Sequence, residues 1–535
     1  HPNIAEQSLI ATTQRLCQLP ASERRSMLRG HCGSSAADDP NASGPQVPDT
    51  VRNLEHKARV ELETSLLQQQ RTDQPGDQIP PRANAGTCVL SFAQQRIWFM
   101  GQLSPESHPY NTGDAVRLRG PMDVEALESA LNALVARHEI LRASISVIDG
   151  EARQRFRDHM HIDLSITNLA SLPEHEQEPA VLRLVSSALK RPYLLDREPL
   201  IRAALVRLGR DDHVFVLCCH HIVTDGWSMR IILRELEILY RDRTHGRTSG
   251  LPALPIQYGD FATWQRNRLQ GEKIQRETEY WVRRLTDVPT MLDLPTDHPR
   301  PKVLSHRGHR QDFHLSGAVS RQVREVSRQL QVSAFTTLST AFAALLFRYS
   351  GQREFVIGLP FADRDRPELQ YLVGLLLDTH VIRFSVSNRT RFRDLIDQTR
   401  SEVAESYAHS DLPFELVVNA VQAERDLGYM PLCQVMVNWR EPSNRMSSLA
   451  LEGLLTESIH PHDRTAKFDL SMTFEDAGEG FKFEVEYSTD LFEAATIERM
   501  AGHFQRLLNG ASQNPACLIG RLPLLGDPEQ NTLLV

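Results

Sequence analysis

The chain has 535 residues, of which 41% are hydrophobic and 24% charged, and its formal net charge is −8. This composition is ordinary for a globular protein, and the length suggests more than one packed unit. The sequence shows no basic stripe, no apolar run of bilayer length and no secretory signal, so we expect a cytoplasmic protein with neither nucleic-acid nor membrane partners. The seven cysteines are scattered and odd in number, which predicts reduced thiols rather than a disulfide scaffold.

The first 85 residues differ in composition from the rest. They contain an amphipathic stretch at 16–28, a run rich in Pro, Gly and Ser at 33–48, and a charged, helix-like stretch at 51–70. We therefore predict a leader over residues 1–85, with a short helix and flexible linkers.

From residue 89 onward, apolar runs of strand length alternate with helical periodicity. The pattern predicts helices at 124–136, 228–240, within 320–348 (two) and at 494–508. It predicts strands at 214–219, 355–358, 379–386, 435–437 and 480–488. This mixture indicates an α/β fold, and its recurrence on both sides of residues 245–300 indicates two lobes.

The most informative segment joins the predicted strand at 214–219 to the predicted helix at 228–240. Two histidines, His220 and His221, end the strand, and Asp225 and Gly226 follow after three residues. Successive strand residues point in opposite directions, so only one imidazole can face a given cleft. Asp225 suits a helix N-cap, and Gly226 permits close approach of a ligand to the backbone.

Three interpretations of this segment compete. Both histidines could be packed in the core, with Asp225 merely capping a helix. A metal site is disfavoured, because adjacent histidines diverge and no further ligands stand at recognisable spacing. The third is acyl transfer, in which one histidine acts on the attacking nucleophile and Asp225 is a structural, ionised residue paired with an arginine.

Residues 220–228 resemble the active-site motif HHxxxDGxS of nonribosomal peptide synthetase condensation domains. Further segments resemble other motifs of this family in the family's order, and the resemblance covers about residues 89–526. These segments are 91–98, 137–142, 258–264, 373–379, 409–415, 425–432, 467–470 and 487–492.

The resemblance implies two chloramphenicol-acetyltransferase-like lobes forming a V with a central tunnel. The donor-side N-terminal lobe is expected at residues 86–265 and the C-terminal lobe at 266–526, with 527–535 beginning a linker to a downstream adenylation domain. The donor would be an acyl-CoA or a donor carrier protein, and the acceptor an aminoacyl group on a peptidyl carrier protein. Phosphopantetheine arms of the carriers deliver these substrates, and neither a covalently bound cofactor nor a metal is implied.

The resemblance also implies roles for the motif residues. His221 would contact the acceptor amine, as general base or as positioning group, and His220 would support it. Gly226 would offer a backbone contact near the reacting centre. Together with Asp225 these residues form the predicted catalytic group, and Trp227 and Ser228 are predicted to bind substrate.

We expect Asp225 to pair with Arg364, on the opposite lobe. Nearby Arg353 and Arg366 leave open that Arg364 is only one of several solvated charges. The chain also departs from the family pattern. It has Asp378 where the family often has Asn, and Leu376 and Leu377 where aromatic residues are common.

The subtype is predicted from several local features. Cys219 before the histidine pair speaks against the three-histidine variant linked to β-lactam formation, and residues 226–228 speak against an epimerization domain. Residues 1–85 lack a carrier-like Gly-Gly-x-Ser, which favours a starter domain that N-acylates the first amino acid of a lipopeptide. The alternatives are an elongation domain, a non-catalytic recruitment module of the same fold, and a free-standing acyltransferase.

Overall fold

The structure is a computed structural model that describes residues 78–84, 86–103, 110–197, 199–421, 428–440, 449–459, 464–526 and 529–531. The chain divides into two compact units, one of residues 1–77 with 328–333 and one of residues 78–327 with 334–535. The predicted leader features at 16–28, 33–48 and 51–70 lie outside the described residues. The account below concerns the second unit.

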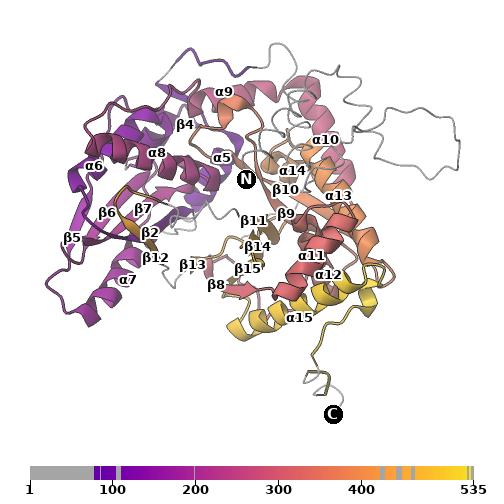
Figure 1. Cartoon of the computed structure of the whole chain (residues 1–535). Coiled ribbons are helices and arrows are strands. Elements are labelled where there is room, and N and C mark those ends of the chain that lie inside the picture. The colour runs from indigo at the N-terminus through magenta and orange to yellow at the C-terminus, as the bar shows by residue number, and fades with distance from the viewer. Residues whose placement is uncertain are drawn as a thin grey trace, which may run out of the picture. The chain divides into compact units, whose positions relative to one another are not determined.

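Helices and strands alternate along this unit, as the sequence predicts (Figure 1). The helices are α5 (Phe92–Leu103), α6 (Val124–Arg137), α7 (Glu174–Lys190), α8 (Gly226–Thr244), α9 (Tyr258–Arg268), α10 (Gly271–Leu285), α11 (Gly317–Gln329), α12 (Ala334–Ser350), α13 (Phe392–Ala408), α14 (Phe414–Ala420) and α15 (Ala494–Gln513). Short 3-10 turns are η1 (Glu139–Arg142), η2 (His221–Val223), η3 (Pro367–Leu369) and η6 (Ile519–Arg521).

Among the described residues, the strands form three sheets. They are β1 (Thr87–Val89), β2 (Asn111–Arg119), β3 (Ala143–Ile148), β4 (Glu151–Phe156), β5 (Ser165–Asn168), β6 (Ile201–Arg207), β7 (Asp212–His220), β8 (Arg307–His314), β9 (Glu354–Ala362), β10 (Leu377–Ser385), β11 (Val435–Trp439), β12 (Leu455–Ile459), β13 (Arg464–Thr465), β14 (Leu470–Asp476) and β15 (Phe481–Ser488). All the strands and helices predicted from residue 124 onward have counterparts among these elements.

The first lobe is built on a five-stranded sheet of order β12-β2-β7-β6-β5, beside a three-stranded sheet of order β1-β4-β3. Strand β7 lies in the middle of the larger sheet, and its two faces meet different cores. Phe215 and Leu217 pack in the larger core with α6 and α8, whereas Val214 and Val216 pack in a second core with α7. A strand buried on both faces reads as a continuous apolar run, which explains why the sequence identified it.

The second lobe is built on a seven-stranded sheet of order β10-β9-β11-β14-β15-β8-β13, in which β11 runs parallel to both of its neighbours. Helix α12 packs against α13 and α15 (Figure 1). Phe504 of α15 packs near Phe474 and Phe483, whose ring centroids lie 5.8 and 5.2 Å from its own. Such ring pairs stabilise the helix layer on the sheet.

Within the range 266–526 that was predicted for the C-terminal lobe, two segments cross to the first lobe. Strand β12 pairs antiparallel with β2, from Leu455 opposite Arg119 to Ile459 opposite Ala115. Residues 369–376 supply buried leucines to the first lobe's core. The physical reason is that β12 covers an edge of β2 that would otherwise expose unpaired backbone groups, and sequence order does not reveal such a pairing.

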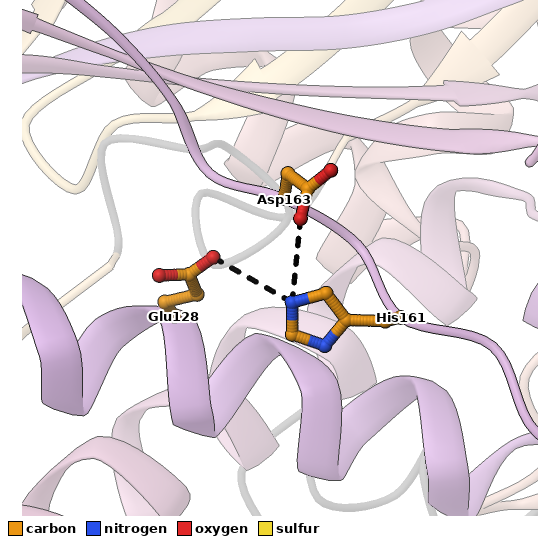
Figure 2. A group of neighbouring side chains, drawn as sticks. All are labelled: Glu128, His161 and Asp163. Atoms are coloured by element: carbon orange, nitrogen blue, oxygen red, sulfur yellow. Dashed lines mark ion pairs between the residues drawn. The ribbon is translucent and has the colours of Figure 1, made fainter.

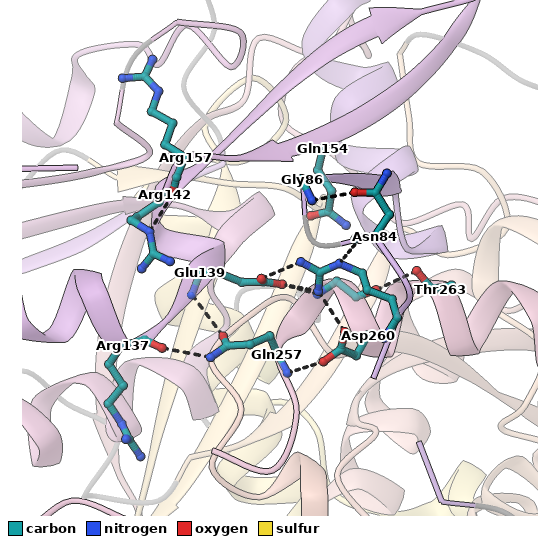
Figure 3. A network of polar contacts seen from close by, with 12 residues as sticks. Asn84, Gly86, Arg137, Glu139, Arg142, Gln154, Arg157, Gln257, Asp260 and Thr263 are labelled. Atoms are coloured by element: carbon teal, nitrogen blue, oxygen red, sulfur yellow. Dashed lines mark hydrogen bonds and ion pairs between the residues drawn. The ribbon is translucent and has the colours of Figure 1, made fainter. Parts of the chain in front are cut away.

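A buried polar network ties two of the family-like segments together (Figure 3). Arg82 donates to both carboxylate oxygens of Glu139, at 2.8 and 2.7 Å, and to Asp260 at 2.9 Å. Glu139 also accepts a hydrogen bond from the backbone of Gly259 at 2.9 Å. A Cβ at Gly259 would lie 2.5 Å from the Arg82 guanidinium, so this glycine is required by the network. The segments at 137–142 and 258–264 are therefore structural.

The described residues include no single helix that is both long and apolar enough to cross a membrane. Helices α11 and α12 pass such a test only as a pair, and they are bent by 108° relative to one another. Most side chains of α12 are buried in the protein core.

Candidate active site

The histidine pair stands where β7 ends and the short turn η2 begins. His220 is the last residue of β7 and is buried, and His221 opens the turn and is half-buried. Gln94 of α5 supports the turn, because its side-chain amide donates to the carbonyl of Ile222 at 3.1 Å. The backbone N–H of His221 donates to the carbonyl of Tyr110 at 2.7 Å. The backbone that carries both imidazoles is thus held from two sides.

The hydrogen bond of the His221 ring determines its tautomer. Nδ1 lies 2.6 Å from the carbonyl oxygen of Thr224. A carbonyl oxygen can only accept, so Nδ1 carries the proton and Nε2 of the neutral ring carries a lone pair. His221 therefore presents a hydrogen-bond acceptor at Nε2.

Burial keeps this ring neutral. It lowers the pKa of His221 to about 3, and the positive charge of Lys467 acts in the same direction, against smaller contributions from Thr224 and Asp225. Burial likewise lowers the pKa of His220 to about 3, with His221 and Lys467 adding to the effect. At neutral pH the resting site holds two uncharged imidazoles.

The ring of His220 packs against aromatic side chains rather than against Thr224. Its ring centroid lies 5.8 Å from that of Tyr193, edge-on, and 6.5 Å from that of Tyr110. Its Nδ1 accepts the backbone N–H of Ile222 at 3.2 Å. His220 also lines a cavity of about 360 Å³ together with Tyr110 and Tyr193. The predicted supporting role of His220 stays a prediction.

Asp225 caps helix α8 and belongs to the buried framework of the site. Its carboxylate accepts hydrogen bonds from the backbone N–H groups of Ser228 at 2.7 Å, Leu376 at 3.0 Å and Leu377 at 3.1 Å. Arg364 pairs with it at 3.2 Å, with both side chains almost completely buried. The pairing with Arg364 that the family resemblance implies is confirmed.

The charge state of Asp225 follows from these contacts. Burial alone would raise the pKa of Asp225, but Arg364 and the hydrogen bonds from Ser228 and Leu376 outweigh it and lower the pKa below its ordinary value. Every oxygen of the carboxylate is bonded to protein, so Asp225 is a structural member of the motif and not a group that touches substrate.

Arg364 and Ser228 complete a cross-lobe cluster with Asp225, which we call the latch: Asp225, Ser228, Arg364 and residues 369–377. Arg364 donates to the carbonyls of Leu369 and Leu372, both at 2.6 Å, and to the hydroxyl of Ser228 at 2.8 Å. Bonds from Arg364 to Leu369 and Leu372 secure the segment that crosses to the first lobe.

Ser228 was predicted to bind substrate, but the structure places its side chain in a different position. It is completely buried, and its hydroxyl donates to the carbonyl of Gly374 at 2.7 Å and accepts the N–H of the same residue at 3.0 Å. The N-cap geometry of Asp225 turns this hydroxyl inward, which is why it belongs to the latch. Sequence spacing could not reveal that direction.

Gly374 is a latch residue that sequence reasoning missed. Its φ is +155°, and an added Cβ would lie 1.9 Å from the ring of Tyr258. Tyr258 in turn donates to the carbonyl of Leu375 at 2.7 Å. Glycine is needed here because both the backbone angle and the close approach of the ring exclude a side chain.

Trp227 and Gly226 lie on the outer side of the same turn. The indole N–H of Trp227 donates to the carbonyl of Gln370 at 3.2 Å, and the guanidinium of Arg230 lies 3.9 Å from the ring centroid. Gly226 is exposed, and an added Cβ would meet no heavy atom of the described chain within 4 Å. The protein itself therefore gives no steric reason for a glycine at 226.

Lys467 is the second residue that sequence reasoning missed. It precedes β14, and its ammonium lies 5.4 Å from the ring centroid of Tyr110, whose carbonyl bonds to His221. Burial lowers the pKa of Lys467 to about 8, against the attraction of Glu486. The only sequence signal was a lysine inside a family-like segment, and nothing in its spacing connected it to the histidines.

Asp378, the departure from the family pattern, joins a second charged group beside the site. It accepts backbone N–H groups from Thr379 at 2.7 Å and Phe414 at 3.3 Å. Burial raises the pKa of Asp378 to about 7, and Glu415 adds to this while Arg96 opposes it. Arg96 and Glu415 themselves form an ion pair at 3.0 Å.

One group of described side chains has the composition of a metal site (Figure 2). His161 Nε2 lies 3.8 Å from a carboxylate oxygen of Glu128 and 3.4 Å from one of Asp163. His161 and Asp163 are exposed, and Glu128 already accepts the backbone N–H of Leu164 at 3.2 Å. Ion pairing at the surface accounts for these contacts.

Comparisons with known proteins identify the family of this chain. The condensation-domain family model matches residues 84–534. A linear gramicidin synthase polypeptide of Brevibacillus parabrevis is 41% identical over 474 residues, covering 88% of this chain and 6% of that protein. Phosphinothricin tripeptide synthetase PhsC of Streptomyces viridochromogenes is 38% identical over 482 residues, covering 89% of this chain and 44% of that protein. The chain thus spans less than half the length of each of these relatives.

Solved structures show the same fold. The X-domain from teicoplanin biosynthesis, solved in complex with OxyB, is similar with a TM-score of 0.76 at 25% identity, covering 85% of this chain and 99% of that one. The four-domain nonribosomal peptide synthetase AB3403, bound to AMP and glycine, is similar with a TM-score of 0.75 at 21% identity, covering 86% and 35%.

Family match, fold and motif together define the class: an amide-bond-forming acyltransferase of α/β architecture. The chain belongs to the condensation-domain family of nonribosomal peptide synthetases. The predicted V-shaped arrangement with a central tunnel stays a prediction.

Proposed function

We propose that this chain joins a donor acyl thioester to the amine of a carrier-bound aminoacyl acceptor, and that His221 Nε2 is the atom that receives the acceptor amine. The observation that carries this proposal is the hydrogen bond from His221 Nδ1 to the Thr224 carbonyl, 2.6 Å long, which leaves Nε2 as an acceptor. An amine N–H donated to that nitrogen would direct the amine's own lone pair toward the thioester carbon.

The proton balance of the reaction defines what His221 has to do. A neutral amine attacks the thioester carbon, the carbon–sulfur bond breaks, and the amine proton ends on the leaving thiolate. A ring with a pKa lowered to about 3 is a weak base at neutral pH. His221 therefore acts first by positioning, and it carries the proton only as positive charge develops on the attacking nitrogen.

Gly226 supplies space and a backbone donor in this proposal. It is the first residue of α8, and N–H groups at a helix N-terminus stabilise developing negative charge. The open surroundings of its Cα support a role in admitting substrate. A side chain at this position would occupy the volume where the tetrahedral intermediate forms.

The partners belong to the proposal as well. Donor and acceptor arrive as thioesters on the phosphopantetheine arms of carrier proteins, with acyl-CoA as the alternative donor. A downstream adenylation domain in the same polypeptide is proposed because residues 522–529 resemble the linker into such a domain. The starter role, with a fatty acyl donor and a lipopeptide product, stays a prediction beside the elongation alternative.

One experiment tests the reaction and its donor together. The protein is incubated with a loaded aminoacyl carrier and either medium- and long-chain acyl-CoAs or an upstream aminoacyl carrier, and the acceptor carrier is analysed by intact mass. A mass increase equal to the donor acyl group supports amide formation, and His221→Ala should abolish it in a folded protein. Absence of product with every donor would favour the non-catalytic recruitment module instead.

A further inference from the structure

The cavity beside His220 is lined by two hydrogen-bond donors that no described group accepts. Its volume is about 360 Å³, and its wall consists mainly of the end of α5, the start of β2, strand β3 and residues 193–196. The volume lies within the range of about 300–1,000 Å³ that small-molecule sites occupy. The cavity is therefore large enough to receive part of a substrate.

The first donor is the phenol of Tyr193. This residue is 8% exposed, and its hydroxyl has no hydrogen-bond partner among the described residues. Burial raises the pKa of the Tyr193 phenol well above its ordinary value, so the hydroxyl keeps its proton and can donate it to an acceptor. A buried polar group normally has a partner, because nothing else compensates for its lost hydrogen bonds to water. The phenol thus points to a ligand.

The second donor is Nε2 of His220. Nδ1 of the same ring accepts the backbone N–H of Ile222 at 3.2 Å, and burial keeps the ring neutral by lowering its pKa to about 3. A neutral imidazole carries a single N–H, so its proton lies on Nε2. Within the described part of the chain, no group accepts a hydrogen bond from this nitrogen.

Packing holds the two donors beside each other. The ring centroids of Tyr193 and His220 lie 5.8 Å apart, with an interplanar angle of 78°. The guanidinium of Arg202 covers the other ring, 3.8 Å from the centroid of Tyr193. Arg202 is fixed in turn, because it donates to the carbonyls of Arg191 and Pro192 at 2.9 and 2.8 Å. Donors that are held in place before binding lose little conformational entropy when an acceptor arrives.

Two further polar side chains of the wall are engaged elsewhere. Asn111 donates its amide nitrogen to the carbonyls of Leu189 and Arg191, at 2.7 and 2.9 Å. Asp196 is exposed and accepts a hydrogen bond from its neighbour Arg197 at 3.1 Å. The acceptor for both donors therefore has to come from a molecule that enters the cavity.

We infer that Tyr193 and His220 bind a hydrogen-bond-accepting oxygen of one of the two substrates, a hydroxyl or carbonyl outside the reacting thioester, and so select oxygenated substrates. This inference rests on the proposed function, in which the backbone of Gly226 meets the reacting carbonyl. A site built to bond a hydroxyl discriminates against an analogue that lacks it, because the donors of the site then stay unpaired.

The test compares substrates that differ by one oxygen. In the donor arm, 2-, 3- and 4-hydroxyoctanoyl thioesters are compared with octanoyl, using a glycyl carrier as acceptor. In the acceptor arm, seryl and homoseryl carriers are compared with alanyl and 2-aminobutyryl carriers, using an acetyl donor. In one arm kcat/KM should be about tenfold higher with the oxygen, and that arm identifies the substrate. Equal values in both arms would overturn the inference while leaving amide formation, and thus the proposed function, intact.

Two variants connect the preference to these donors. Tyr193→Phe removes the phenol oxygen, and His220→Phe removes the N–H while keeping an aromatic ring. Each should lower the ratio of oxygenated to deoxygenated kcat/KM by about tenfold. The matched control is Tyr280→Phe, which removes a phenol that donates to Glu405 at 3.3 Å and does not line this cavity; it should leave the ratio unchanged.

Thermal unfolding and turnover identify a variant that fails to fold or to react, and the other variant then decides. An unchanged ratio in a folded, active Tyr193→Phe protein would overturn the inference. An equal loss of kcat/KM with and without the oxygen is such a result, because it would place the phenol at the reacting carbonyl. Absence of amide with every pair, in the wild-type protein, would instead overturn the proposed function and this inference with it.

Discussion

The two halves of one nine-residue motif differ sharply in how their polar atoms are bonded. Asp225 and Ser228 are buried, and their oxygens are occupied by Arg364 and by backbone groups from residues 374–377. His221 is half-buried, its Nδ1 is fixed by Thr224, and Gly226 borders open space. The contrast separates a structural latch from an edge formed by His221 and Gly226, which we call the reactive edge because the proposed function assigns the chemistry to it.

The largest expected effect comes from breaking the latch. Arg364→Met leaves the carboxylate of Asp225 buried without its cation, which should lower the free energy of unfolding by about 3–5 kcal/mol. Urea denaturation measures this free energy of unfolding. Arg353→Met, at an exposed arginine nearby, is the control and should change stability by less than about 0.5 kcal/mol. Equal stability of the two variants would contradict the latch.

Two glycines sharpen the comparison: Gly374 belongs to the latch, and Gly226 belongs to the reactive edge. Gly374→Ala forces a methyl group into the ring of Tyr258 and should destabilise the protein by about 1–3 kcal/mol. Gly226→Ala meets no described protein atom, so its stability should stay within about 0.5 kcal/mol of wild type while turnover falls. Thermal unfolding and amide formation are measured on both. Full turnover by Gly226→Ala would contradict the assignment of Gly226 to the reactive edge.

The neutral histidines predict a dependence of stability on pH. Their pKa values are lowered to about 3, whereas an unfolded histidine titrates near 6.5. Between these values the unfolded chain binds more protons, so stability should fall as pH drops below about 6.5, by up to about 1.4 kcal/mol per pH unit for each histidine. The depressed pKa of Asp225 adds a loss below about pH 4.

The measurement is urea denaturation between pH 7.5 and pH 4.5, in wild type and in His220→Gln. The variant lacks one of the two histidine contributions and should show the shallower slope. Identical slopes would mean that folding does not lower the pKa of His220.

The smallest expected effect concerns Lys467. Lys467→Met removes a positive charge that lowers the pKa of His221, so that pKa should rise. Because burial is the larger cause, the pKa should nevertheless stay below its ordinary value near 6.5. NMR titration of the histidines measures the pKa of His221. The control is Lys482→Met, on the sheet of the second lobe, which should leave this pKa unchanged. A fall in the pKa would contradict the assigned sign.

Much of this arrangement could be predicted from sequence, for identifiable physical reasons. Strand β7 is buried on both faces and therefore carries a continuous apolar run, and Asp225 stands at the N-cap of a strongly periodic helix. The pairing of Asp225 with Arg364 came from the family resemblance rather than from spacing. Local pattern and family order together were enough for these features.

What escaped prediction depends on side-chain direction and on long-range pairing. Ser228 looked available to substrate, but the cap turns it inward toward Gly374. Lys467 lies about 250 residues from the histidines in sequence, and β12 pairs with β2 across a still longer separation. No local pattern encodes contacts of that kind.

The most direct test of the division between latch and reactive edge is a paired measurement on His221→Gln, in which unfolding free energy and amide formation are determined on one preparation. Loss of the bond to Thr224 should lower stability by no more than about 1.5 kcal/mol, while turnover falls by about 10²–10⁴-fold. A folded His221→Gln protein with wild-type turnover would contradict the account.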